Sequence, residues 1–174
     1  PKAAVISQVK PLVVVDAIMA KCNTGTSLLD APLVIGLGPG FTAGYDVHAV
    51  IETCRGHDLG RVIYQGSAKD NTGSPGAMLG YTKERLLRAP ASGVLLPVQT
   101  IGTLVNAGDV VAFVGLQPVK ATIAGRLRGL AKAGLWVKQG MKIGDIDPRG
   151  AEANHTTISD RALAVAGGIL EAVF

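Results

Sequence analysis

The chain has 174 residues, of which 48% are hydrophobic, 17% are charged and 4% are aromatic, and its formal net charge is +4. This size allows one domain or two small ones, and the composition is typical of a soluble globular protein. No apolar run reaches the roughly 18 residues that span a bilayer, which argues against a membrane protein. Dispersed basic residues with few aromatics argue against nucleic-acid binding. The 23 glycines favour a β-rich fold with many turns.

The two cysteines, Cys22 and Cys54, form no C-x-x-C pair, and no signal peptide precedes them. This usage predicts free thiols in a reducing compartment, and therefore a cytoplasmic location. The modest positive charge favours a small acidic molecule or an acidic protein surface as the partner.

Two nearly continuous aliphatic runs, Leu12–Asp16 and Leu33–Leu37, are typical of parallel strands that are buried on both faces. We therefore expect them to pair side by side. The polar connection between them is short for the crossover helix of a full βαβ unit. The first part of the chain is thus predicted to be only partly Rossmann-like.

A glycine-rich loop, GLGPGFTAG, follows the second run and contains a G-x-G-x-x-A match at Gly38, Gly40 and Ala43. In dinucleotide-binding folds this motif opens a helix and receives a pyrophosphate. Here a β pattern follows, and Pro39 removes one amide donor. A structural turn is therefore favoured, with anion binding by the loop amides as the functional alternative. That alternative makes Gly36, Gly38 and Gly40 candidate cofactor-binding residues.

Residues Asp46–Thr53 alternate in polarity, which places His48 and Glu52 on one face of a predicted strand. The strand Arg61–Gln65 is predicted to complete a hairpin whose loop holds His57. An imidazole beside a carboxylate suits general acid–base chemistry, so His48, Glu52 and His57 are candidate catalytic residues. The alternative is a structural role for all three, and no metal is assigned.

The clearest pattern is an internal repeat of Ser92–Val114 in Ala124–Ile146, offset by 32 residues without a gap. Glycines and aliphatic residues coincide in both copies, in the pairs Gly93 and Gly125, Leu95 and Leu127, Gly102 and Gly134, Val105 and Val137, Gly108 and Gly140, Val111 and Ile143, and Val114 and Ile146. The pattern resembles the two halves of the barrel-sandwich hybrid of biotinyl and lipoyl carrier domains. Lys120 lies off the centre of the joint between the copies, so a solvated lysine is favoured over a lysine-linked prosthetic group.

The segment KIGDIDPRG brings Asp147 next to Arg149, as either a structural ion-pair clamp or an anion-binding pair. The chain then closes with a predicted helix capped by Ser159. Its expected buried stripe is Ala162, Leu163, Ala166, Ile169, Leu170 and Val173. Gly167-Gly168 in mid-helix predicts the close approach of another backbone.

Together these elements predict a β-rich α/β protein with three segments. Residues 1–85 are expected to form an α/β unit with the glycine loop and the histidine hairpin. Residues 86–150 are expected to form the barrel-sandwich-hybrid-like repeat domain. Residues 151–174 are expected to form a C-terminal helix that packs back on the first unit.

Several stretches together resemble one family, the bacterial selenium-dependent molybdenum hydroxylase system proteins, over essentially the whole chain. They are VVVDAIMAK (13–21), APLVIGLGPGFTAGYDVHAVIET (31–53), RGHDLGRVI (55–63), NTGSPG (71–76), KIGDIDPRG (142–150) and TISDRALAVAGGILEAV (157–173). The resemblance implies the C-terminal part of a longer protein, without a Rossmann-like N-terminal segment.

The same resemblance implies an accessory factor in the maturation of molybdenum hydroxylases. It would bind the molybdenum cofactor, or a sulfur or selenium donor, and its partners would be the hydroxylase or other maturation proteins. Two alternatives stay open: a hydrolase or transferase acting on a nucleotide-like substrate, and a non-catalytic interaction module with a lipoyl-like fold. Whether the chain is an enzyme, and whether it forms a homo-oligomer, are also open.

Overall fold

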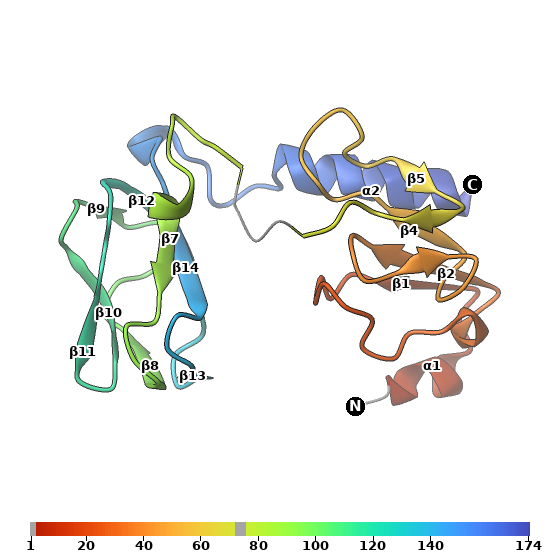
Figure 1. The fold of residues 1–174 in the computed structure, drawn as a ribbon, viewed down its shortest axis with the longest axis horizontal. Helices are drawn as coiled ribbons and strands as arrows, with labels where there is room; N and C mark the ends of the chain where they lie inside the picture. The colour runs from red at the N-terminus through yellow and green to blue at the C-terminus, as the bar shows by residue number, and fades with distance from the viewer. Residues whose placement is uncertain (1–2, 72–75) are drawn as a thin grey trace. The chain divides into compact units, whose positions relative to one another are not determined.

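The computed structural model describes residues 3–71 and 76–174 of a β-rich α/β chain (Figure 1). The chain divides into two compact units, Pro1–Gly73 with Ile158–Phe174, and Ser74–Thr157. The division falls ahead of the expected boundary at residue 85. Of the expected 151–174 segment, Ile158–Phe174 joins the first unit and the residues before it belong to the second. The reason is pairing, because strand β7 (Leu86–Arg88) and the 3-10 turn η2 (Lys83–Arg85) before it pack against β14 (Lys142–Asp147) of the second unit. In the part of the chain that the structure describes, no helix is long and apolar enough to cross a bilayer.

The first unit is built on a four-stranded sheet in the order β1-β2-β4-β5, in which β1, β2 and β4 are parallel and β5 is antiparallel. Its strands are β1 (Val13–Asp16), β2 (Leu33–Leu37), β4 (Ala49–Ile51) and β5 (Val62–Ile63). The remaining elements are the helix α1 (Ala4–Val9), the 3-10 turn η1 (Leu28–Asp30), the small strand pair β3 (Thr42–Ala43) and β6 (Gly66–Ser67), and the C-terminal helix α2 (Asp160–Val173). The predicted pairing of the first two aliphatic runs is confirmed, with Val13 opposite Leu33, and so is the hairpin of β4 and β5.

The centre of this sheet is covered on both faces. Val34 and Val50 belong to one apolar cluster, and Ile35 and Ile51 belong to a second cluster on the opposite face. At the edge strand β1 the cover is partial, since Val15 is 37% exposed. The expected one-sided polar face of residues 46–53 was wrong, because β4 is a central strand buried on both sides and regular only over three residues.

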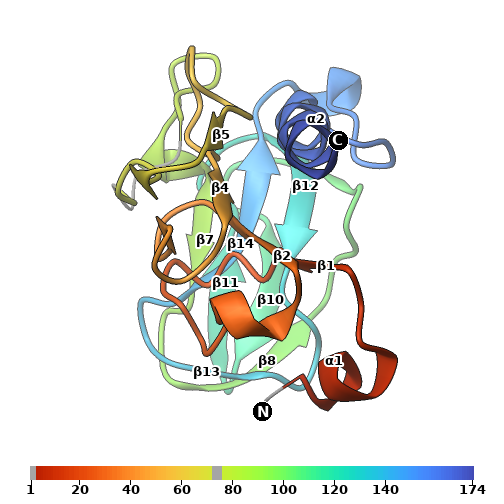
Figure 2. The ribbon, with the colours of Figure 1, turned by 90° about the vertical axis from the view of Figure 1, so that its right-hand side faces the viewer.

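Helix α2 packs against β2, β4 and β5, and Figure 2 shows it nearly end-on beside this sheet. A Cβ at Gly168 would collide with the Gly60 carbonyl, so the predicted close approach of another backbone is confirmed there, whereas Gly167 faces open space. This contact sets the rotation of the helix. The predicted stripe was therefore wrong in phase: Leu163 and Leu170 are 59% and 58% exposed, and the buried face contains Val165 and Gly168.

The second unit consists of two four-stranded sheets, in the orders β11-β10-β8-β13 and β7-β14-β12-β9. The other strands are β8 (Gly93–Pro97), β9 (Leu104–Val105), β10 (Val110–Val114), β11 (Gln117–Lys120), β12 (Gly125–Leu130) and β13 (Trp136–Val137), and a 3-10 turn η3 (Gly150–Glu152) follows β14.

The predicted repeat is confirmed as two β-rich halves in one register. Strands β8, β9 and β10 begin 32 residues before β12, β13 and β14. The halves exchange strands, because β8 pairs with β13 while β9 pairs with β12. The turns match as well: Gly102 N–H donates to the Leu127 carbonyl (2.7 Å), and Gly134 N–H donates to the Leu95 carbonyl (2.9 Å). Each sheet is thus assembled from both copies.

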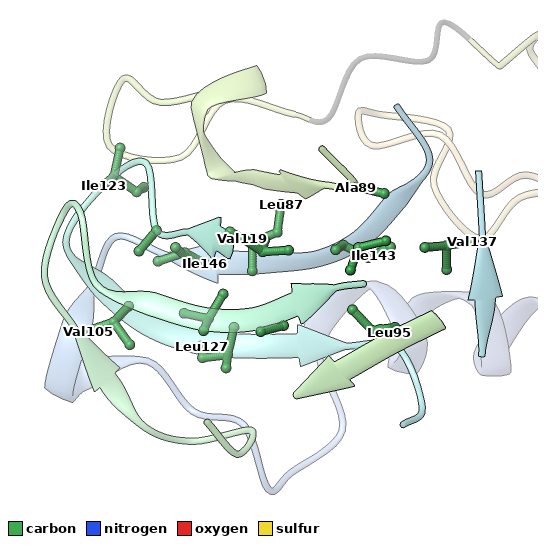
Figure 3. Packing of buried hydrophobic residues seen from close by; sticks show 14 residues of the cluster. Leu87, Ala89, Leu95, Val105, Val119, Ile123, Leu127, Val137, Ile143 and Ile146 are labelled. Carbon is green, nitrogen blue, oxygen red and sulfur yellow. The ribbon is translucent and has the colours of Figure 1, made fainter. Parts of the chain in front are cut away.

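One aliphatic cluster fills the space between these two sheets (Figure 3). Leu95 and Leu127, which occupy equivalent positions in the two copies, are both 0% exposed. The hairpin between β10 and β11 turns at Gly115-Leu116, and Leu116 is 94% exposed at its tip. Lys120 is exposed at the end of β11 rather than at this tip, which fits the expectation of a solvated lysine.

Candidate functional site

The polar residues of the first unit gather where its three parallel strands end. β1 ends in Asp16, β2 runs into the glycine loop at Gly38, and β4 is followed by Glu52 and Thr53. In open α/β sheets this carboxyl edge is where ligands bind. We therefore take it as the candidate functional site.

The segment after β1 is held in an unusual conformation. The Asp16 carboxylate is buried and accepts hydrogen bonds from the Ile18 N–H (3.0 Å) and the Thr26 hydroxyl (2.6 Å). Between these anchors, Met19 and Lys21 have φ angles of 60° and 67°, which side-chain-bearing residues rarely adopt. Such residues persist where the surrounding structure enforces them, and they cluster at binding sites.

The glycine loop is wedged between two neighbouring segments. A Cβ at Gly38 would lie 2.5 Å from Thr53 Oγ1, and one at Gly40 would lie 2.6 Å from Cys22 Cα, and both glycines have positive φ. Gly36 packs against an aromatic ring in the same way. Close packing and backbone conformation therefore account for all three glycines as structural. In the described part of the chain, the exposed Gly40 N–H donates no hydrogen bond, so one amide is available to an anion.

Glu52 serves as a clamp between two loops. Its side chain is buried, at 2% exposure, and accepts the Cys54 N–H at Oε1 (2.7 Å) and the Lys69 N–H at Oε2 (2.9 Å). A carboxylate that satisfies two backbone amides holds both loops at the edge of the sheet. It is not the orienting partner that was expected for His48.

The two candidate histidines lie elsewhere. His48 sits at the amino end of β4, where its Nδ1 accepts the Val34 N–H (3.0 Å), so it lies at the opposite edge of the sheet from Gly38. His57 is exposed in the connection to β5 and lines a wide, open hollow with Arg61 and Glu171. The structure therefore does not bring His48, Glu52 and His57 together, and their catalytic roles stay predictions.

Several cations surround the carboxyl edge, each with a partner. Lys69 Nζ lies 2.6 Å from Asp58 Oδ2; this hydrogen bond holds the pKa of Asp58 below its usual value and raises the pKa of Lys69. Arg55 makes two hydrogen bonds to Asp160 in the first turn of α2, at 2.7 and 3.1 Å. Lys21 Nζ donates to Asn71 (3.0 Å). These cations are thus engaged by neighbouring side chains, two of them by the carboxylates of Asp58 and Asp160.

Beside this edge, α2 roofs a pocket of about 320 Å³. Its walls are mainly aliphatic, and the lining residues are Met19, Leu37, Thr53, Ser159, Arg161, Ala162, Val165, Ala166 and Ile169. Sequence reasoning missed this pocket, although Thr53 lies two residues after the apolar run Ala49–Ile51, where site residues of parallel sheets gather. The side chains from α2 carry no comparable pattern.

Asp147 and Arg149 belong to the second unit and form an ion-pair clamp. The Asp147 side chain is 0% exposed, and it accepts Arg149 Nε (2.9 Å), Nη2 (2.6 Å) and backbone N–H (3.1 Å). Arg149 lowers the pKa of Asp147, with a further contribution from Arg128. The pair closes the turn after β14, so the geometry favours the structural alternative over an anion site.

Both cysteines are free thiols, as predicted, and both are exposed. Cys22 packs against Gly40, and Cys54 follows Thr53, which packs against Gly38, so both border the glycine loop. Within residues 3–71 and 76–174, no group of three or more His, Cys, Asp and Glu side chains is arranged to hold a metal ion.

Comparison with known proteins gives one close relative. The chain is 54% identical over 173 residues to YqeB of Escherichia coli strain K12, an uncharacterized protein. The match covers 99% of this chain and 32% of YqeB, so the chain spans about a third of the length of that curated relative. No family model matches the chain.

Among solved structures, the similarity is low and partial. An aspartoacylase family protein from Mesorhizobium loti aligns over 37% of this chain and 23% of its own at 17% identity, with a TM-score of 0.34. The ectoine utilization protein EutE (DoeB) of Ruegeria pomeroyi aligns over 48% of this chain and 27% of its own at 18% identity, also with a TM-score of 0.34.

Proposed function

We propose that this chain is part of an accessory protein for the maturation of molybdenum hydroxylases, acting in the cytoplasm. Its first unit would hold the cargo, which is the molybdenum cofactor or a sulfur or selenium donor, at the carboxyl edge of the sheet. The motifs quoted above support the pathway, and the net charge of +4 supports an anionic cargo.

The observation that carries the cargo role is the placement of the two thiols. Cys22 and Cys54 are exposed and border one glycine loop from two sides. A thiolate is the reactive form of cysteine, and an exposed one can carry an additional sulfur atom as a persulfide.

The test uses the full-length protein in cells that lack it. We expect Cys22→Ser and Cys54→Ser together to abolish the activity of the dependent hydroxylase without changing the level of the accessory protein. Mass spectrometry after alkylation should find an added sulfur or selenium on one of the thiols of the unaltered protein. Normal hydroxylase activity in the double variant would refute the thiol role.

A second candidate function, protein docking, is supported by the outer faces of the two sheets of the second unit. We propose that this unit is a barrel-sandwich hybrid of the lipoyl type that uses one face to bind a partner. On the face of β8 and β13, Val94, Leu96 and Trp136 are 42%, 52% and 58% exposed. The equivalent positions of the other sheet hold Arg126, Arg128 and Leu104. Arg126 donates a hydrogen bond to the Gly102 carbonyl (2.7 Å), so a polar group on that face already has a partner within the unit.

The repeat provides a matched control for docking. Trp136→Ser and Leu104→Ser remove apolar side chains of similar exposure, 58% and 54%, from equivalent strand positions. We expect only the first to weaken binding of the purified hydroxylase, or of a second copy, by titration calorimetry and sedimentation. Equal effects of both variants would exclude a docking role for the apolar face.

A further inference from the structure

We propose that the pocket under α2 binds a flat molecule of one or two fused rings that carries a single anionic group. This inference rests on the proposed function only for the choice of ring, and otherwise on the lining of the pocket. The pocket combines an apolar body with two polar side chains, Thr53 and Arg161, that have no partner in the described parts of the chain.

Thr53 offers the first polar contact. Its side chain is buried, with the residue 3% exposed, and its hydroxyl makes no hydrogen bond to any described residue. Because no fully enclosed side-chain oxygen among those residues lacks a partner, the Thr53 hydroxyl keeps some accessible surface, and Thr53 lines the pocket. Gly38 leaves room beside it, since a Cβ there would touch Oγ1. Buried hydroxyls are normally bonded, so this one is suited to a ligand.

Arg161 offers the second contact, and its position is unusual. It lies in the first turn of α2, half-buried, and forms no ion pair or hydrogen bond with the described residues. A cation is disfavoured at a helix N-terminus, where the helix dipole favours an anion. The adjacent Asp160 is engaged by Arg55. A carboxylate or phosphate bound to the guanidinium would be stabilised by both the charge and the dipole.

The remaining walls determine the body of the ligand. Leu37, Val165 and Ile169 present aliphatic surface, and the flexible Met19 adapts to the shape of a ring. A volume of about 320 Å³ is at the small end of ligand pockets and excludes a dinucleotide. The pocket therefore fits a small heterocycle whose ring atom bonds Thr53 while its carboxylate or phosphate reaches Arg161.

The experiment uses the 174-residue chain and follows the intrinsic fluorescence of pterins on titration. The probes are pterin-6-carboxylate, the phosphate ester of 6-hydroxymethylpterin, unsubstituted pterin and inorganic phosphate. We expect at least one of the two anionic pterins to bind about tenfold more tightly than pterin, and inorganic phosphate not to compete. The tighter of the two identifies the anion as carboxylate or phosphate.

Variants locate the site. Arg161→Gln should weaken binding of the anionic pterin about tenfold and leave that of unsubstituted pterin unchanged, and Ala166→Leu should fill the pocket and abolish both. Arg61→Gln, which alters a cation lining the other hollow of this unit, is the matched control and should change nothing. Binding that survives Ala166→Leu, or the absence of binding by all probes, would overturn the inference. If no pterin binds but the cysteine double variant loses maturation, this inference falls and the proposed function stands. If an anionic pterin binds but the double variant matures the hydroxylase normally, the proposed function falls and this inference stands.

Discussion

The two units differ in how their apolar clusters and polar side chains are arranged. The second unit repeats one strand pattern and encloses a single aliphatic cluster, and its buried carboxylate Asp147 is fully paired by Arg149. The first unit divides its apolar residues between two smaller clusters on opposite faces of one sheet. It leaves two exposed thiols and an unpaired Arg161 along one edge of that sheet, within the described residues.

This difference separates stability from chemistry. In the second unit, almost every buried residue has an equivalent that does the same work in the other half. In the first unit, the segments at the carboxyl edge are held by a few buried carboxylates, Asp16 and Glu52, each of which accepts two hydrogen bonds. We therefore expect core substitutions to affect the second unit most, and substitutions of exposed residues at the edge of the first unit, such as Cys22 and Cys54, to affect ligand binding with little effect on unfolding.

The largest effect is expected from the shared core of the repeat. Leu127→Ala should destabilise the second unit by about 2–5 kcal/mol, because it leaves a cavity between two sheets. Trp136 is the only tryptophan and lies in this unit, so its fluorescence reports the transition in denaturant. Leu116→Ala, at a 94% exposed tip, is the control and should have no effect. A loss of protection of β2 amides from hydrogen exchange in Leu127→Ala would show that the units do not unfold separately.

The next effect tests the buried ion pair. Because Arg149 lowers the folded-state pKa of Asp147, the pair contributes fully above the unfolded pKa of about 3.9, and this contribution is lost as the pH falls through the lower folded value. Asp147→Asn should cost about 1.5–3 kcal/mol at neutral pH and flatten the acid limb of the stability curve of this unit below about pH 4. Asp58→Asn, which breaks an exposed ion pair in the first unit, should leave the acid limb of the second unit's stability curve unchanged. An unchanged acid limb in Asp147→Asn would contradict the assignment.

A smaller effect is expected where α2 meets the first unit. Gly168→Ala should destabilise that unit by about 1–3 kcal/mol, because the added methyl meets the Gly60 carbonyl. Gly167→Ala, one residue away in open space, should instead stabilise the helix by about 1 kcal/mol. Thermal unfolding of the pair measures the difference. Equal behaviour of the two variants would mean that the helix is free to rotate.

The smallest effect concerns His48. Replacing it with Ala removes the acceptor for the Val34 N–H and should cost about 0.5–1.5 kcal/mol of stability in the first unit. Pterin binding and hydroxylase maturation should stay normal, since His48 lies at the far edge of the sheet from Gly38. Lost maturation with unchanged stability would return His48 to the functional site.

Sequence reasoning succeeded where one local pattern determines the structure. The repeat was predictable because Gly102 and Gly134 need the same turn, and the pairing of β1 with β2 because both are continuous aliphatic runs. The phase of α2 was not, since it depends on one contact between Gly168 and the distant Gly60. The boundary between the units depends in the same way on the pairing of β7 with β14.

The same contrast between local patterns and distant contacts explains which parts of the candidate site were predictable. The glycine loop was identified because its motif is contiguous, but the pocket was not, because Thr53 and Arg161 come from the two separate segments of the first unit. His48 and Glu52 share an expected strand face, yet one occupies each end of β4, since the regular strand is only Ala49–Ile51. Alternation along a sequence says little about a central strand that is buried on both sides.

The exchange of strands between the halves of the second unit has a consequence for how it is made. As the chain is synthesised, β7 emerges early, but its partner β14 is the last strand of the unit, so neither sheet can close until both halves are present. Gly115-Leu116 begins the link between the halves, residues 115–123, and it turns at the surface. A protease that cut there would leave two fragments still interlocked by shared sheets, so the unit is a natural candidate for a split protein that reassembles from separately expressed halves.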